Sequence, residues 1–103
     1  MSEAKFTIGQ IVQHQLFDYR GVIVDVDYKF LGTEEWYDEV ARSRPPKDKS
    51  WYHVLVNDSV HQTYVAECNL ESSKESIPIH HPLLDHYFNG IADGIDQSRT
   101  RMN

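Results

Sequence analysis

Hydrophobic and polar positions indicate strands most clearly between residues 48 and 71. Two runs rich in aromatic and β-branched residues, Trp51–Val56 and Val60–Ala66, flank the short segment Asn57-Asp58-Ser59. Such residues favour strands, and Asn and Asp tolerate the backbone angles of a tight turn. The two faces of the first run are both fairly apolar, with Tyr52, Val54 and Val56 on one and Trp51, His53 and Leu55 on the other. The pattern predicts a hairpin inside a closed or layered sheet.

A second hairpin is predicted nearer the N-terminus. Ile11–Leu16 and Val22–Tyr28 are both typical of strands, and Phe17–Gly21 provides a turn that ends in glycine. Regular alternation along the second strand places Val22, Val24, Val26 and Tyr28 on one face. Ile23 begins the other face, and the two strands are predicted to form a second hairpin.

Residues 29–50 interrupt the strand pattern. Thr33 suits a helix N-cap, because the acidic residues that follow it are favourable at a helix N-terminus. A helix is expected over about 34–41, and the Pro45-Pro46 pair prevents it from continuing. The insertion is electrically polarised: Glu34, Glu35, Asp38 and Glu39 come first, and Arg42, Arg44, Lys47 and Lys49 follow.

The C-terminal part predicts two smaller elements. Ile77-Pro78-Ile79 is expected to form a short edge strand, since proline is tolerated at a sheet edge. Pro82–Phe88 predicts one or two helical turns that Asn89-Gly90 ends. Together the elements indicate a mainly β protein, a small barrel with a short helical insertion and a short C-terminal helix. Residues 1–95 are expected to be one domain and residues 96–103 a flexible tail.

Composition narrows the class of protein. The chain has 103 residues, a net charge of −6 and a pI of about 5.4. This balance argues against a dedicated nucleic-acid-binding protein, although it leaves room for a local basic patch. Cys68 is the single cysteine, so no internal disulfide forms and a reducing compartment is favoured. No signal-peptide core and no membrane-length apolar run is visible, so we expect a cytoplasmic protein.

Six histidines and Cys68 raise the alternatives of a metal site or a nucleophile. The candidate ligands are His80, His81 and His86 with Cys68 or His61. Paired ligand spacings are absent, as are a nucleophile elbow and a phosphate-binding glycine loop. We therefore predict a non-enzymatic protein with no catalytic residue, metal or cofactor.

Several blocks of sequence together resemble the HspQ (YccV-like) hemimethylated-DNA-binding family over roughly residues 6–88. The blocks are Phe6, Gly9-Gln10 and Val12-x-His14, then YRGVI at 19–23, WYHVLV at 51–56, TYVAE at 63–67 and NLE at 69–71. Each block is weak by itself, but the combination is specific. Cys68 departs from the pattern, which has an acidic residue at this position.

The resemblance implies an SH3-like β-barrel that assembles as a homotrimer, and it implies two activities. The leading expectation is a heat-shock regulatory module that acts as a specificity-enhancing adaptor of the ATP-dependent Lon protease and is itself a Lon substrate. The alternative is a protein that binds hemimethylated DNA at the replication origin. Aromatic residues expected to be exposed are candidates for a protein interface, although barrel core or trimer packing is an alternative role for them. They are Trp36, Tyr37, Tyr19 and Tyr87.

We assign contact with DNA or a protein partner to a set of basic and aromatic residues. The loop at 42–49 offers cations for phosphates, and nearby aromatic rings offer stacking surfaces. The alternative is a solvated loop that balances the acidic stretch before it. Because the net charge repels a polyanion, DNA binding is expected to be weak and steeply salt-dependent. The candidate contact residues are Tyr19, Arg20, Arg42, Arg44, Lys47, Lys49 and Trp51.

Overall fold

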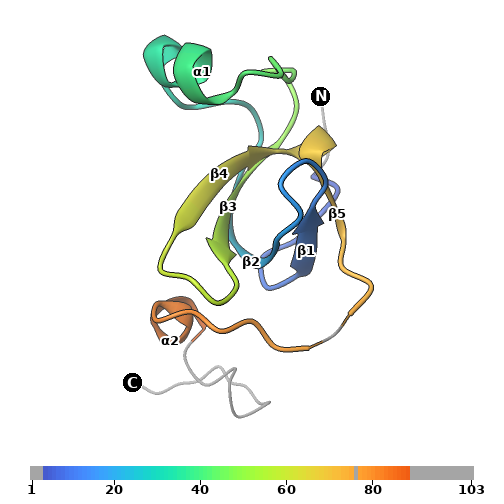
Figure 1. Ribbon diagram of the computed structural model, residues 1–103. Helices are drawn as coiled ribbons and strands as arrows, with labels where there is room; N and C mark the ends of the chain where they lie inside the picture. The colour runs from blue at the N-terminus through green and yellow to red at the C-terminus, as the bar shows by residue number, and fades with distance from the viewer. Residues whose placement is uncertain (1–3, 76, 89–103) are drawn as a thin grey trace.

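Five antiparallel strands form one bent sheet in the computed structural model, which describes residues 4–75 and 77–88 (Figure 1). The strand order is β4-β3-β2-β1-β5, so β4 and β5 form the edges. The mainly β architecture is confirmed, but the described strands form an open, curled sheet and not a closed barrel. The elements are β1 (Ile11–His14), β2 (Arg20–Asp27), α1 (Glu34–Val40), β3 (Trp51–Val56), β4 (Gln62–Ala66), a 3-10 turn (Glu67–Asn69), β5 (Leu70–Ser72) and α2 (Leu84–Tyr87).

The β3–β4 hairpin is confirmed and lies beside β2 in the sheet. Its register pairs Trp51 with Ala66 and Leu55 with Gln62. β4 begins two residues later than predicted, and Val60 is 73% exposed in the connection. Both faces of β3 are covered: Tyr52 and Val54 belong to one buried cluster, whereas Leu55 belongs to another.

A β-bulge in β2 changes which side chains face the core. The register with β3 shifts between Ile23 and Asp25, so Asp25 lies opposite His53. Val22 and Val24 pack in the cluster near α2, whereas Val26 packs in the cluster of Tyr52. The single valine face predicted for Val22, Val24, Val26 and Tyr28 is therefore wrong, because one extra residue moves the following side chains to the opposite face.

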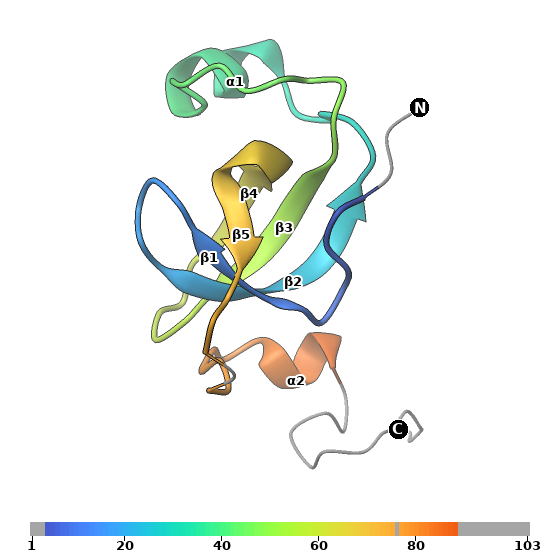
Figure 2. The same cartoon turned by 90° about the vertical axis from the view of Figure 1, so that its right-hand side faces the viewer.

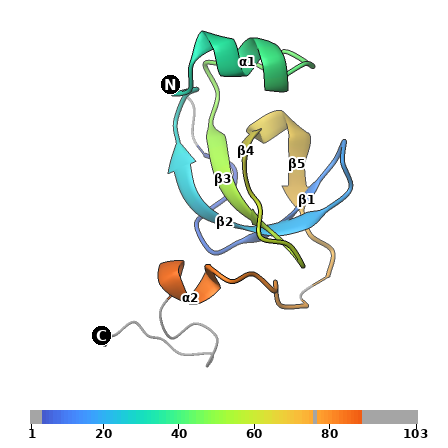
Figure 3. The same cartoon turned by 60° about the vertical axis from the view of Figure 1, so that its left-hand side comes forward.

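The helical insertion is confirmed as α1. The hydroxyl of Thr33 accepts a hydrogen bond from the backbone N–H of Trp36 at 3.1 Å, which is the predicted N-cap. Tyr37 is the buried residue of α1, and its hydroxyl donates to the carbonyl of Pro45 at 2.6 Å. Figure 2 and Figure 3 show α1 and α2 at opposite ends of the curled sheet.

The C-terminal part differs from the prediction. Residues 77–79 form no strand; Ile79 is instead buried beside Val22 and Leu55 under α2. The fifth strand is β5, which pairs with β1 through Gln13 and Glu71. α2 is a single turn within the predicted 82–88 segment.

Two further expectations, the stop at Asn89-Gly90 and the 96–103 tail, lie outside the described residues. No helix of the described ranges has the length and apolar character needed to cross a membrane. The domain boundary at residue 95 stays a prediction.

Candidate functional site

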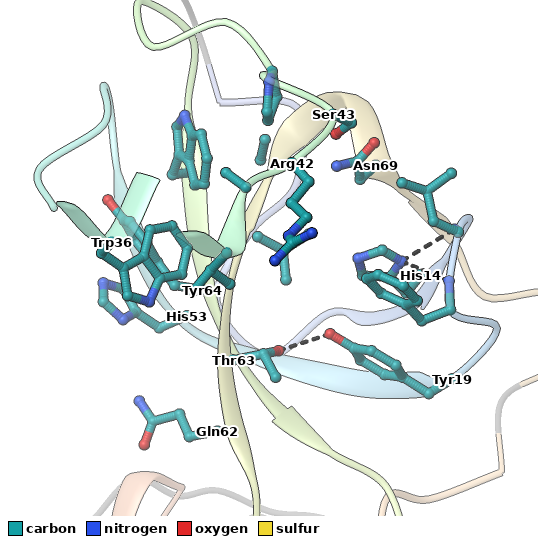
Figure 4. A pocket seen from close by; sticks show the side chains of 18 residues that line it. His14, Tyr19, Trp36, Arg42, Ser43, His53, Gln62, Thr63, Tyr64 and Asn69 are labelled. Carbon is teal, nitrogen blue, oxygen red and sulfur yellow. Dashed lines mark hydrogen bonds between the residues drawn. The ribbon is translucent and has the colours of Figure 1, made fainter. Parts of the chain in front are cut away.

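A pocket of about 800 Å³ opens between β4, the β1–β2 loop, α1 and the residues that follow α1 (Figure 4). Two groups of rings face each other across it. The first wall is defined as His14, Phe17 and Tyr19, and the second wall as Trp36, His53 and Tyr64. We call this cavity the aromatic pocket. Its volume falls within the range of about 300–1,000 Å³ that is usual for ligand sites.

Hydrogen bonds fix the first wall. The buried His14 ring accepts hydrogen bonds at Nδ1 from the backbone N–H groups of Leu16 and Phe17, both at 3.1 Å. The centroid of this ring lies 4.8 Å from that of Phe17 and 5.0 Å from that of Tyr19. The Tyr19 hydroxyl lies 2.7 Å from the Thr63 hydroxyl of β4, which links the two sides of the pocket. The loop is therefore held in place although Leu16 and Phe17 are exposed.

Acidification is expected to destabilise the protein through His14. Burial lowers the pKa of His14 from its usual value of 6.5, and its Nδ1 must be unprotonated to accept the loop hydrogen bonds. The unfolded chain thus binds this proton more readily than the folded chain. The contribution of His14 to stability is complete above about pH 6.5 and is lost as the pH falls toward the folded-state pKa. One titrating group changes the free energy of unfolding by at most about 1.4 kcal/mol per pH unit.

Urea unfolding of the wild type and a His14→Gln variant between pH 7.5 and pH 5.5 tests this expectation. The variant should lose part of the pH slope, whereas a His86→Gln control, changed at an exposed histidine of α2, should keep it. Identical slopes in all three proteins would contradict a role for His14.

An acidic residue behind the second wall holds it in place. Tyr64 donates to the carboxylate of Asp27 at 2.7 Å and accepts from the backbone N–H of Leu31 at 3.1 Å. His53 Nε2 lies 3.2 Å from the same Asp27 oxygen. Burial, with a further contribution from Asp27, raises the pKa of Tyr64 to about 12. The phenol is therefore neutral at physiological pH. The Trp36 centroid lies 5.6 Å from that of Tyr64.

Within the described residues, one cluster of side chains offers metal-ligating atoms close together. Potential ligand atoms of Asp25, Asp27 and His53 lie within 4.8 Å of one another. The bulge in β2 produces this arrangement, because it brings Asp25 opposite His53. This cluster contains none of the residues that the sequence suggested as metal ligands. Three ligands are fewer than the four of a closed zinc site, and the Asp27 oxygen already accepts from Tyr64.

Three of the predicted contact residues line the aromatic pocket: Tyr19, Arg42 and Trp51. Arg42 is exposed, and Figure 4 shows its side chain between the two walls. Trp51 is only 1% exposed, and its indole N–H donates to the carbonyl of Pro46 at 3.0 Å. Trp51 therefore forms part of the buried support of the pocket and does not offer a free stacking face.

Two other basic residues of the insertion pair with acidic residues of the same segment. Arg44 lies 3.1 Å from the carboxylate of Asp38, and Lys47 pairs with Glu34. Both cations also lie over the Tyr37 ring, at 4.9 and 4.2 Å from its centroid. The acidic and basic halves of the insertion thus partly neutralise each other, although exposed pairs of this kind are worth about 1 kcal/mol or less. Lys49 is exposed beside a smaller cavity.

Arg20 lies apart from this basic segment and binds the chain that follows β5. Its side chain is 13% exposed, and its Nε lies 3.4 Å from the Ser73 hydroxyl and 3.7 Å from the Glu75 carboxylate. The guanidinium also donates to the backbone carbonyl of Ile77. These contacts give Arg20 a structural role and separate it from the aromatic pocket.

Sequence reasoning missed His14, Phe17, His53 and Tyr64 as members of one site. A signal existed in Leu16-Phe17, since two large apolar residues are unusual in a predicted turn. The partners of these residues come from β3, β4 and α1, and a local pattern does not bring such distant segments together.

Comparison with known families agrees with the resemblance noted in the sequence. The family model described as "Hemimethylated DNA-binding protein YccV like" matches residues 4–95. The match spans both pocket walls, the insertion and every described strand. The chain therefore belongs to the YccV-like family of hemimethylated DNA-binding proteins.

Proposed function

We propose that the protein binds hemimethylated DNA and that the face with the aromatic pocket makes the contact. The observation that carries this proposal is the charge of the pocket. The chain has 16 acidic residues, yet the described residues that line the pocket include Arg42 and no carboxylate. A polyanion meets less repulsion here than on an average part of an acidic surface. Membership of a hemimethylated DNA-binding family supports the same function.

Phosphate contacts are assigned to the basic segment beside the pocket. Arg42, Arg44, Lys47 and Lys49 provide four cations, and two of them are already paired with carboxylates. The salt slope is the slope of the logarithm of the binding constant against the logarithm of the salt concentration. Complete neutralisation of four phosphates gives a salt slope of about −4, so we expect a slope no steeper than this. Non-specific attraction is then small, and discrimination between methylation states depends on groups other than phosphate-binding cations.

Fluorescence anisotropy at two salt concentrations tests the proposal. The ligands are three duplexes of one sequence, which are unmethylated, hemimethylated and fully methylated. The hemimethylated duplex should bind most tightly. Arg42→Gln should weaken binding to all three duplexes and reduce the salt slope by about 1. Lys74→Gln, an exposed lysine after β5, serves as the matched control. Equal affinity of the wild type for the three duplexes would refute the proposal.

Regulation of the Lon protease and assembly as a homotrimer, which the resemblance implies, stay predictions. The description of the family names DNA and not a protease. DNA binding is therefore the leading proposal, whereas the sequence alone favoured the adaptor role.

A further inference from the structure

We infer that the aromatic pocket receives one nucleobase that has left the DNA stack, and that this is the methylated base. The inference rests on the proposed function and names the ligand of the same site. It starts from the two ring-bearing walls that stand on opposite sides of the cavity in Figure 4. A nucleobase is flat and has two aromatic faces, so a gap between two such walls suits its shape.

The walls are formed before any ligand arrives. His14 holds the backbone of the Phe17 loop, and the Tyr19–Thr63 hydrogen bond of 2.7 Å ties this loop to β4. Asp27 holds the ring of Tyr64 on the other side. A preformed pocket avoids the free-energy cost of ordering side chains when the base binds.

Three of the residues that line the pocket are apolar and largely exposed. Phe17 is 73% exposed, Val40 is 57% exposed and Leu16 is 56% exposed. Apolar groups gathered around a concavity mark a binding site. They also offer contact to a methyl group, which the edge of an unmethylated base lacks.

A base that remains paired and stacked within a duplex cannot place both of its faces against the walls of this pocket. Proteins that take a base into a pocket first extrude it from the helix, and the cost of a few kcal/mol is lowest for weakly paired bases. Arg42 lies between the walls and is placed to contact the phosphate of the extruded nucleotide. Gln62 presents a side-chain amide at the pocket, and amides pair with the polar edge of a base.

The first test replaces an exposed aromatic residue of the pocket, a change that leaves the fold intact. Phe17→Ala should weaken binding to the hemimethylated duplex about tenfold, the usual effect of losing one stacking ring. The salt slope should stay unchanged, because no cation is removed. Tyr28→Ala is the matched control, since this tyrosine is 65% exposed and does not line the pocket. It should bind as the wild type does.

The second test places the methylated base opposite an abasic site, which removes the cost of unpairing it. The wild type should then bind about fivefold more tightly or better than it binds the paired duplex. Phe17→Ala should lose most of this gain. If the wild type prefers hemimethylated DNA but shows neither the gain nor an effect of Phe17→Ala, the pocket has another occupant, such as a peptide, and the inference is overturned while the proposed function stands. If the wild type shows no preference among methylation states, both fail.

Discussion

Replacement of Trp51 by alanine is expected to lower the free energy of unfolding by about 3–5 kcal/mol, as is usual for a fully buried tryptophan. The side chain is 1% exposed at the start of β3. Its ring centroid lies 4.8 Å from that of Phe30, 5.2 Å from that of Tyr64 and 6.3 Å from that of Tyr37. Removal of the indole leaves a cavity where the insertion packs on the sheet. It also leaves the Pro46 carbonyl without its donor.

Urea denaturation followed by far-UV circular dichroism measures this loss. Trp51→Phe keeps an aromatic ring and should lose clearly less stability than Trp51→Ala. Val60→Ala, at a 73% exposed position between β3 and β4, should change stability by about 0.5 kcal/mol or less. A loss below about 1 kcal/mol for Trp51→Ala would mean that α1 is not anchored through this ring.

Replacement of Gly21 by valine is expected to be as damaging, for a steric reason. A Cβ atom at this position would lie 2.4 Å from Cγ1 of Val54 and 2.6 Å from the backbone carbonyl oxygen of Leu55. Because the second obstacle is the backbone of Leu55, a fully buried residue of β3, the strands β2 and β3 must move apart. Overpacking of this kind costs about 3 kcal/mol, at the upper end of the usual range.

Thermal unfolding of Gly21→Val and Gly21→Ala, compared with Gly32→Ala, tests the steric explanation. The nearest atoms to a Cβ at Gly32 belong to the half-buried ring of Phe30, and a side chain gives way more readily than backbone. Both Gly21 variants should therefore lose more stability than Gly32→Ala, and the valine variant should lose the most. Equal effects at the two glycines would show that the β2–β3 spacing tolerates a side chain.

Elements with local signals were predictable from the sequence. The β3–β4 hairpin follows from two apolar runs around a polar turn, and α1 follows from Thr33 and the acidic residues after it. The bulge in β2 has no local signal, since Val24 continues a regular valine pattern. β5 is only three residues long and acidic at its centre, so its pairing with β1 depends on tertiary contacts.

The candidate site was predictable only in part, and for a similar reason. The cationic segment was visible because its charges are adjacent in sequence, and Arg42 does reach the aromatic pocket. Arg20 was grouped with it on charge alone, whereas the fold directs this side chain to Ser73 and Glu75. The pocket walls come from segments that lie far apart along the chain, so only the folded structure brings their rings together.

The pairing of β1 with β5 has a consequence for the order in which the chain folds. Gln10 and Ser72, which hydrogen-bond beside this pair, are 62 positions apart, whereas β3 and β4 are joined by a short turn. The entropy of closing so long a loop delays contacts between distant segments. We therefore expect the β3–β4 hairpin to form first and the β1–β5 pair to close last. Because this pairing has only three residue pairs and lies at the edge of the sheet, we also expect it to open more readily than the pairing of β2 with β3.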